Sequence, residues 1–386
     1  MMKAVELFAG AGGLGIGVSR AGFKPAAIIE WDRWACDTMR ENKARKIKPV
    51  STWPIVESDV REFDFRAINN VDLVSGGPPC QPFSLGGKHQ AYRDDRDMFP
   101  SAIRAVRDLQ PKAFLFENVK GLTRATFANY LQYIRLQLRF PEITRRQNED
   151  WYGHLSRLEQ VETSGAYSGL HYNVVIRLLN AADYGVPQRR ERVFIVGFRA
   201  DIGLEWCFPA ATHSNEALQY SKWVTGEYWD RHGIRDWDSS CGPRKFAARP
   251  SKLLPWRTVR DALHDLPDPE LDPAAAARFA DHRFIPGARS YPGHTGSPSD
   301  EPAKTLKAGA HGVPGGENML RRPDGSVRYF SVRESARLQT FPDDFVFHGA
   351  WGETMRQLGN AVPVTLAEVV ARSIRTQLSA MVRRSD

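Results

Sequence analysis

The sequence predicts an α/β protein built on a doubly wound, mostly parallel sheet. Over the first 200 residues, short and nearly continuous apolar runs alternate with amphipathic stretches. Strands of this kind are buried on both faces by the helices that connect them. Ligands of such sheets bind beyond the carboxyl ends of the strands, so the loops after the apolar runs are the expected place for a functional site. The expected strands are residues 4–8, 26–29, 71–75, 113–116 and 192–196.

A second, irregular region follows this alternation. Between about residues 201 and 330, proline and glycine are frequent, and arginine and lysine recur without a helical period. An Asp-Gly pair in residues 321–329 predicts a β-hairpin. Residues 365–381 are expected to form an amphipathic helix that packs back onto the first domain. We therefore expect one domain of residues 1–200 plus 355–386 and a smaller domain of residues 201–354. The tryptophans crowded into the irregular region are Trp206, Trp223, Trp229, Trp237 and Trp256, and each is expected to belong to a structural core.

Composition narrows the class of protein. Apolar residues make up 42% and charged residues 25%, which argues against a disordered chain or a disulfide scaffold. The formal net charge of +8 makes a polyanionic partner plausible. No run approaches the ~20 apolar residues that cross a bilayer, and no signal peptide is evident, so a cytoplasmic location is expected. The four cysteines show no CxxC spacing, so neither a metal site nor a disulfide framework is predicted.

A glycine-rich turn follows the first expected strand. Gly10, Gly12 and Gly15 have the GxGxxG spacing that lets a backbone turn sharply beneath a nucleotide. Glu30 closes the next strand, where a carboxylate can accept hydrogen bonds from ribose hydroxyls. Together they predict a cofactor that contains adenosine. NAD and S-adenosylmethionine both fit, and a tight turn that binds nothing is the alternative.

Cys80 lies in a proline-rich loop after the strand at 71–75. Three prolines within five positions, 78, 79 and 82, restrict this part of the backbone. A buried structural cysteine needs no such restriction. Glu117 follows the strand at 113–116, and convergence of the two loops at one sheet edge is expected to bring it near Cys80, although a carboxylate there is often only a strand end.

The loop at 77–84 resembles the nucleophile loop of DNA (cytosine-5) methyltransferases, and residues 8–15 resemble the cofactor loop of the same family. Further matches follow in the family's order. The resemblance implies a Rossmann-like domain that uses S-adenosylmethionine and a smaller target-recognition domain. It also implies methyl transfer to the 5-carbon of a cytosine flipped out of a short, specific duplex sequence. The further matching segments are residues 30–32, 58–60, 116–119, 188–192, 333–342 and 357–363.

The resemblance also implies roles for single residues. Cys80 is the expected nucleophile, because a thiolate both adds to and leaves carbon readily. Glu117 is the expected acid at ring nitrogen 3 of the cytosine. Arg192 is expected to bind the cytosine carbonyl oxygen, and Arg190 to support the base and a nearby phosphate. The residues expected to hold the cofactor are Phe8, Ala9, Gly10, Gly12, Gly13, Leu14, Glu30, Trp31, Asp59, Val60, Pro79, Met98, Asn360, Ala361 and Val362. Those expected to contact DNA are Gln81, Ser84, Arg244, Lys245 and Arg257.

The expected partner is double-stranded DNA. The resemblance implies a monomeric, nucleoid-associated enzyme that protects host DNA from a cognate restriction endonuclease without forming a stable complex with it. A tRNA cytosine-5 methyltransferase is the alternative enzyme, although the large basic variable region favours duplex DNA. A catalytically silent DNA-binding module is disfavoured by the intact Cys80, Glu117 and Arg192. An NAD-dependent dehydrogenase leaves Cys80 unexplained.

Overall fold

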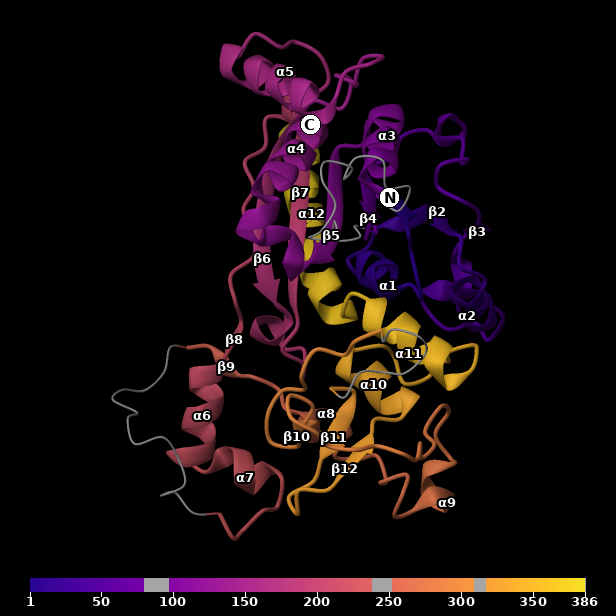
Figure 1. Ribbon diagram of the computed structural model, residues 1–386, viewed down its shortest axis with the longest axis vertical. Coiled ribbons are helices and arrows are strands. Elements are labelled where there is room, and N and C mark those ends of the chain that lie inside the picture. The colour runs from indigo at the N-terminus through magenta and orange to yellow at the C-terminus, as the bar shows by residue number, and fades with distance from the viewer. Residues whose placement is uncertain (80–96, 238–251, 309–316, 386) are drawn as a thin grey trace. The chain divides into compact units, whose positions relative to one another are not determined.

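The structure, a computed structural model, describes residues 1–79, 97–237, 252–308 and 317–385 (Figure 1). Its internal contacts divide the chain into two units. The first unit comprises Met1–Leu179, Glu191–Phe208 and Ala367–Asp386, and the second comprises Asn180–Arg190 and Pro209–Leu366. Residues 355–366 thus fall in the second unit, whereas the functional division predicted from the sequence places them with the first domain.

A seven-stranded sheet with the order β3-β2-β1-β4-β5-β7-β6 forms the centre of the first unit. Neighbours from β3 to β5 pair in parallel, and β7 runs antiparallel to β5. The predicted doubly wound, mostly parallel sheet is therefore confirmed. The strands are β1 (Lys3–Leu7), β2 (Lys24–Glu30), β3 (Ile55–Glu57), β4 (Leu73–Gly76), β5 (Ala113–Val119), β6 (Tyr172–Asn180) and β7 (Glu191–Arg199).

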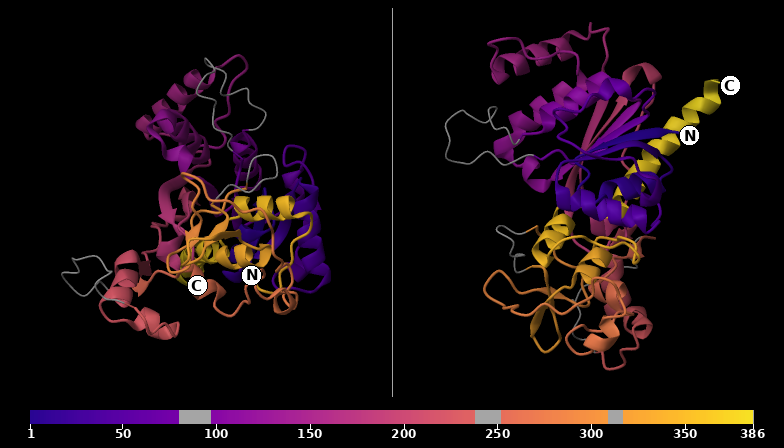
Figure 2. Two further views of the ribbon diagram at one scale, coloured as in Figure 1. Left: turned by 60° about the horizontal axis from the view of Figure 1, so that its bottom comes forward. Right: turned by 90° about the vertical axis from the view of Figure 1, so that its right-hand side faces the viewer.

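Helices cover both faces of this sheet, with α3 and α4 on one face and α1 and α12 on the other (Figure 2). Apolar residues of α3 and α4, such as Ile103 and Leu138, share one buried cluster with the strands. The predicted closing helix is present as α12, which buries Val370 and Ile374. The helices of this unit are α1 (Gly13–Arg20), α2 (Arg33–Ala44), α3 (Phe99–Leu109), α4 (Ala128–Arg139), α5 (Trp151–Ser164) and α12 (Val364–Ser385).

The second unit consists of short elements, as expected for the irregular region. Its predicted hairpin is formed by β11 and β12, which pair antiparallel around Gly325, whose φ is 85°. The elements are β8 (His213–Ser214), α6 (Asn215–Trp223), α7 (Glu227–Arg231), β9 (Leu254–Pro255), α8 (Val259–Leu263), α9 (Pro273–Ala276), β10 (Ser297–Pro298), β11 (Met319–Arg321), β12 (Val327–Tyr329), α10 (Val332–Leu338) and α11 (Trp351–Asn360).

Of the tryptophans of the irregular region, Trp229 is buried in a core and the other four are partly buried. In the second unit they surround the buried Tyr228. Trp206 belongs to the first unit, where its ring packs against Phe198 and Phe208. The four tryptophans around Tyr228 are Trp223, Trp229, Trp237 and Trp256. Among the helices that the structure describes, none combines the length and the apolar character that a membrane span requires.

Candidate active site

One edge of the first unit's sheet gathers most of the predicted site residues. Because β1, β2, β4 and β5 are parallel, their carboxyl ends lie at this edge. The glycine turn follows β1, Glu30 ends β2 and Glu117 lies near the end of β5. Since β7 runs in the opposite direction, its beginning reaches the same edge, where Arg192 pairs with Val119 in the strand register. Sheet topology thus brings together groups that are far apart in sequence.

The Glu30 carboxylate is held against the glycine turn by backbone donors. Its Oε2 accepts a hydrogen bond from the Gly10 N–H at 2.7 Å, and its Oε1 accepts from the N–H groups of Trp31 and Asp32 at 2.9 and 2.8 Å. Burial raises the pKa of Glu30, and these three donors counteract the rise. A carboxylate oxygen can accept two hydrogen bonds, so Oε2 retains an acceptor position for a ribose hydroxyl.

Two glycines of the turn are required for different reasons. Gly12 has a φ of 87°, and a Cβ atom there would lie 2.7 Å from the buried Trp53 ring. Gly10 also has a positive φ, of 54°, but a Cβ atom there would meet nothing within 4 Å. The protein's own packing therefore leaves space beside Gly10, as expected where a backbone approaches a ligand closely. With the ribose acceptor on Glu30 and the 70% exposed Trp31 beside it, the turn fits a cofactor that contains adenosine.

The other predicted cofactor residues occupy varied surroundings. The ring of Phe8, where φ is 55°, packs against the sheet core, and Val60 is buried. The Asp59 carboxylate pairs with Arg61, whose hydrogen bonds lower the pKa of Asp59. The Met98 N–H donates to the Pro79 carbonyl at 3.1 Å. The three predicted residues that belong to the second unit are Asn360, Ala361 and Val362.

Glu117 and Arg192 form a buried ion pair. The Arg192 Nε lies 2.8 Å from Glu117 Oε1, and the two side chains are 11% and 8% exposed. Burial lowers the pKa of Arg192 and the Glu117 charge opposes that effect, so the guanidinium remains a cation. The Arg192 Nη1 also donates to the Glu191 carbonyl at 2.8 Å, which fixes the plane of the guanidinium.

The start of the predicted nucleophile loop lies beside this pair. A Cβ atom on Gly77 would be 3.4 Å from Glu117 Oε2. The Asn118 Nδ2 donates to the Pro78 carbonyl at 2.9 Å, which ties the end of β5 to the start of the predicted nucleophile loop. The backbone three residues before Cys80 therefore runs along the Glu117 carboxylate. Five predicted residues lie outside the described part of the chain, namely Cys80, Gln81, Ser84, Arg244 and Lys245.

Arg190 differs from its expected role. The side chain is fully buried in the second unit, where Nη1 donates to the Leu306 carbonyl at 2.8 Å and Nη2 donates to the carbonyls of Gly359 and Ala361 at 2.6 and 2.9 Å. A guanidinium enclosed by carbonyl groups presents no face to a base or a phosphate. In this structure Arg190 instead holds the backbone on either side of Asn360, within the stretch predicted to close the cofactor pocket.

Sequence reasoning missed two residues beneath the glycine turn. Glu6 lies on β1 with 2% exposure, directly under Gly15, and burial raises its pKa to about 8. Trp53 packs under Gly12, as noted above. A single charged residue between the apolar Val5 and Leu7 was the available signal for Glu6. Arg257, a predicted DNA contact, is exposed.

Comparisons with known proteins agree with this site. The chain matches the family model of C-5 cytosine-specific DNA methylases over residues 2–140, 159–240 and 284–376. It is 33% identical to the Type II methyltransferase M.PspPI of Psychrobacter sp. over 97% of this chain and 79% of that protein. It is 30% identical to the Type II methyltransferase M.NgoMIV of Neisseria gonorrhoeae over 96% of each chain.

Solved structures show the same fold. The S. pombe Dnmt2 methyltransferase aligns with a TM-score of 0.56 at 17% identity, covering 99% of both chains. A prophage-encoded protein of E. coli, assigned as a DNA modification methyltransferase, aligns with a TM-score of 0.59 at 21% identity, covering 98% of this chain and 100% of that one. The Rossmann-like fold, the extent of the family match and the site at the sheet edge lead to one conclusion. The chain belongs to the C-5 cytosine-specific DNA methylase family.

Proposed function

We propose that this chain transfers a methyl group from S-adenosylmethionine to the 5-carbon of a cytosine that is flipped out of a short, specific duplex sequence. The observation that carries the proposal is the buried Glu117–Arg192 pair beside Gly77, three residues before Cys80. An acid, a cationic donor and the loop of a nucleophile thus meet at one sheet edge. Membership of the family supports a DNA substrate, and the open, carboxylate-flanked glycine turn supports the cofactor.

Cys80 begins the reaction because the 5-carbon of cytosine is a weak nucleophile. The Cys80 thiolate forms a bond to the 6-carbon, and electron density moves toward ring nitrogen 3. The Glu117 carboxylate, which takes up a proton from solvent when the base binds, donates that proton to this nitrogen. Bound S-adenosylmethionine, held by the glycine turn and Glu30, would supply an electrophilic methyl group for the enamine carbon and leave as S-adenosylhomocysteine. Water takes the proton from the 5-carbon, ring nitrogen 3 returns its proton to Glu117, and the Cys80 thiolate is expelled as the ring regains its double bond. Cys80 and Glu117 return to their starting states.

Arg192 orients the base during these steps. Its Nε is held by Glu117 and its Nη1 by the Glu191 carbonyl, so the plane of the guanidinium is set before substrate arrives. We assign the Nη2 group to the cytosine carbonyl oxygen, since planar and fixed donors suit that acceptor. The same pairing keeps the Glu117 carboxyl beside the ring nitrogen next to that carbonyl.

The names of the Type II relatives support a wider role for this chain. We propose that the chain acts as a monomer in the cytoplasm, on nucleoid DNA, and protects it from a cognate endonuclease without a stable complex. Residues 1–200 plus 355–386 would form the catalytic domain, and 201–354 the recognition domain. Bisulfite sequencing of DNA from an expressing host reads which cytosine is methylated. The residues proposed to contact DNA are Gln81, Ser84, Arg244, Lys245 and Arg257.

The decisive experiment replaces the proposed nucleophile. Cys80→Ala is expected to abolish both methyl transfer and covalent trapping on a duplex that contains 5-fluorocytosine. Cys207→Ala removes an exposed free thiol elsewhere and serves as the matched control, which should retain both activities. A fully active Cys80→Ala variant would overturn the proposal. Faster turnover on tRNA than on duplex DNA would favour the alternative substrate.

A further inference from the structure

The described chain holds both ends of the segment that carries Cys80. Segment 80–96 begins after Pro79 and ends before Asp97, and a hydrogen bond from the Met98 N–H to the Pro79 carbonyl joins these flanks at 3.1 Å. On the entry side, Asn118 of β5 holds the Pro78 carbonyl. The two flanks are therefore hydrogen-bonded to each other, so a contact that fixes one flank also restrains the other.

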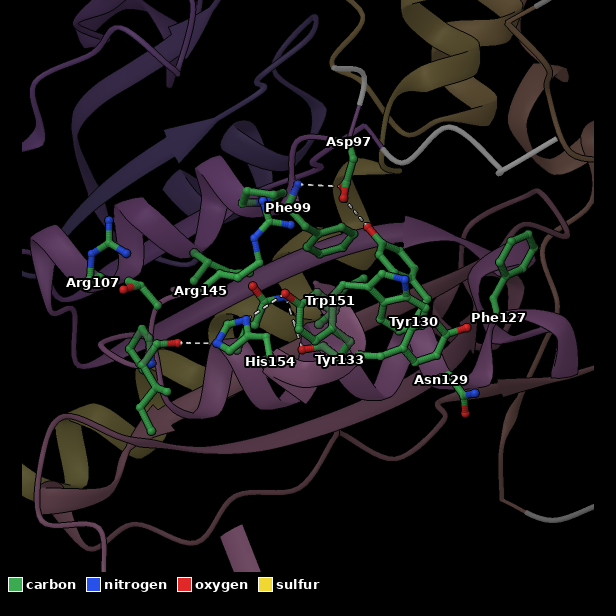
Figure 3. Close-up of a pocket in the computed structure, with 18 of the residues that line it drawn as sticks. Asp97, Phe99, Arg107, Phe127, Asn129, Tyr130, Tyr133, Arg145, Trp151 and His154 are labelled. Atoms are coloured by element: carbon green, nitrogen blue, oxygen red, sulfur yellow. Dashed lines mark hydrogen bonds between the residues drawn. The ribbon is translucent and has the colours of Figure 1, made fainter. Parts of the chain in front are cut away.

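Tyr130 of α4 provides the corresponding contact on the exit side. Its hydroxyl donates to Asp97 Oδ2 at 2.6 Å (Figure 3). The other carboxylate oxygen of Asp97 accepts from the Phe99 N–H at 3.1 Å, which ties the same side chain to the first turn of α3. A short hydrogen bond from a phenol to a carboxylate is charge-assisted and therefore stronger than a neutral one. Asp97 is thus held between two helices.

Helix α4, which carries Tyr130, packs against a part of the chain that the family model does not match. Residues 141–158 lie outside that match, and several of them line a cavity of about 490 Å³ together with α3 and α4 (Figure 3). Tyr133, one turn after Tyr130, lies 2.8 Å from His154 Nδ1, and His154 Nε2 lies 2.8 Å from the Ile143 carbonyl. A carbonyl only accepts, so Nε2 carries the proton and Tyr133 donates to Nδ1. Burial lowers the pKa of His154 and keeps this neutral form.

We propose that Tyr130 is a positioning residue for the nucleophile segment, acting through its hydrogen bond to Asp97. By fixing this carboxylate, Tyr130 sets the point at which the segment rejoins α3. It also places Met98, the next residue, which is among those predicted to hold the cofactor. The inference rests on the proposed function, because it assumes that Cys80 is the nucleophile.

The test compares two tyrosines of the same helix and cavity. Tyr130→Phe and Tyr133→Phe each remove one hydroxyl that donates one hydrogen bond. Tyr130→Phe is expected to slow single-turnover methyl transfer, and trapping on a 5-fluorocytosine duplex, by about tenfold, with little change in DNA affinity. Tyr133→Phe is expected to lower the urea midpoint of unfolding and to keep the transfer rate within about twofold.

A double-mutant cycle distinguishes a loss of positioning by the Tyr130–Asp97 hydrogen bond from a general loss of structure. Asp97→Ala also removes the acceptor of the Phe99 N–H, so it should lose at least as much rate as Tyr130→Phe, whereas Asp97→Asn, which retains an acceptor oxygen, should keep most of the rate. Adding Tyr130→Phe to Asp97→Ala should cause no further loss, because the Tyr130–Asp97 hydrogen bond is already absent in that variant. Additive losses, an unchanged Tyr130→Phe rate, or an equal loss in Tyr133→Phe would each overturn the inference. An active Cys80→Ala variant would instead overturn the proposed function, so the two failures are distinguishable.

Discussion

Replacing Glu117 by glutamine tests the central ion pair of the site. The change keeps the shape of the side chain and an oxygen that can accept from the Arg192 Nε, but it removes the negative charge. Because both side chains are about one tenth exposed, the guanidinium would remain buried without its counter-charge. Glutamine also has no proton of suitable acidity to give to the cytosine ring. The variant therefore changes both stability and catalysis.

The expected magnitudes follow from this burial. Removing one partner of a buried pair costs about 3–5 kcal/mol, and the hydrogen bond retained by glutamine reduces the loss, so we expect about 2 kcal/mol of lost stability. General acid catalysis contributes roughly 10²–10⁴-fold, so we expect the rate of methyl transfer to fall by about 10³-fold. Arg192→Gln in the same background should restore part of the stability but none of the rate.

Two measurements check these figures. Urea unfolding gives the free energy of unfolding, and single-turnover transfer to duplex DNA gives the rate. Glu191→Gln is the matched control, because it makes the same chemical change in an exposed pair with Lys120, whose side chain is 58% exposed. That control should change stability by less than about 0.5 kcal/mol and leave the rate unchanged. A Glu117→Gln enzyme that transfers methyl groups at nearly the parent rate would refute the acid role.

Two further predictions concern the glycine turn and the buried Glu6 beneath it. Gly12→Ala should lower the free energy of unfolding by about 2 kcal/mol or more, because it adds strain at positive φ and an overlap with Trp53. Gly10→Ala should lower the free energy of unfolding by only about 1 kcal/mol and should mainly weaken S-adenosylmethionine binding. Urea unfolding and calorimetric titration separate these effects, and equal losses of stability would contradict them. The pKa of Glu6 is about 8 in the folded protein and near 4.5 in the unfolded chain, so between these pH values only the folded protein holds the proton. The parent therefore loses up to about 1.4 kcal/mol of stability per pH unit as the pH rises through this range. Glu6→Gln removes this loss, so its stability relative to the parent should rise from about pH 5 to pH 8, and parallel pH curves would argue against the assignment.

The sheet was predictable where its strands are continuous apolar runs. Strands β1, β2, β4, β5 and β7 were expected within a few residues of their observed bounds because burial on both faces demands apolar residues at every position. β3 has only three residues, and β6 alternates between more and less buried side chains, so neither contains such a run. The antiparallel direction of β7 was not expected from the pattern, because an apolar run carries no sign of its direction.

The sequence by itself determined the chemical groups available to this protein. The glycine turn, Glu30, the proline-framed Cys80 and Glu117 are local patterns, and each depends only on residues close together in the chain. The tertiary structure decided which of these groups meet and which are buried. Arg192 reaches Glu117 because β7 runs antiparallel to β5, and Arg190 is enclosed by carbonyls up to 171 residues away. Contacts over such separations depend on how elements pack, and local residue order does not specify that packing.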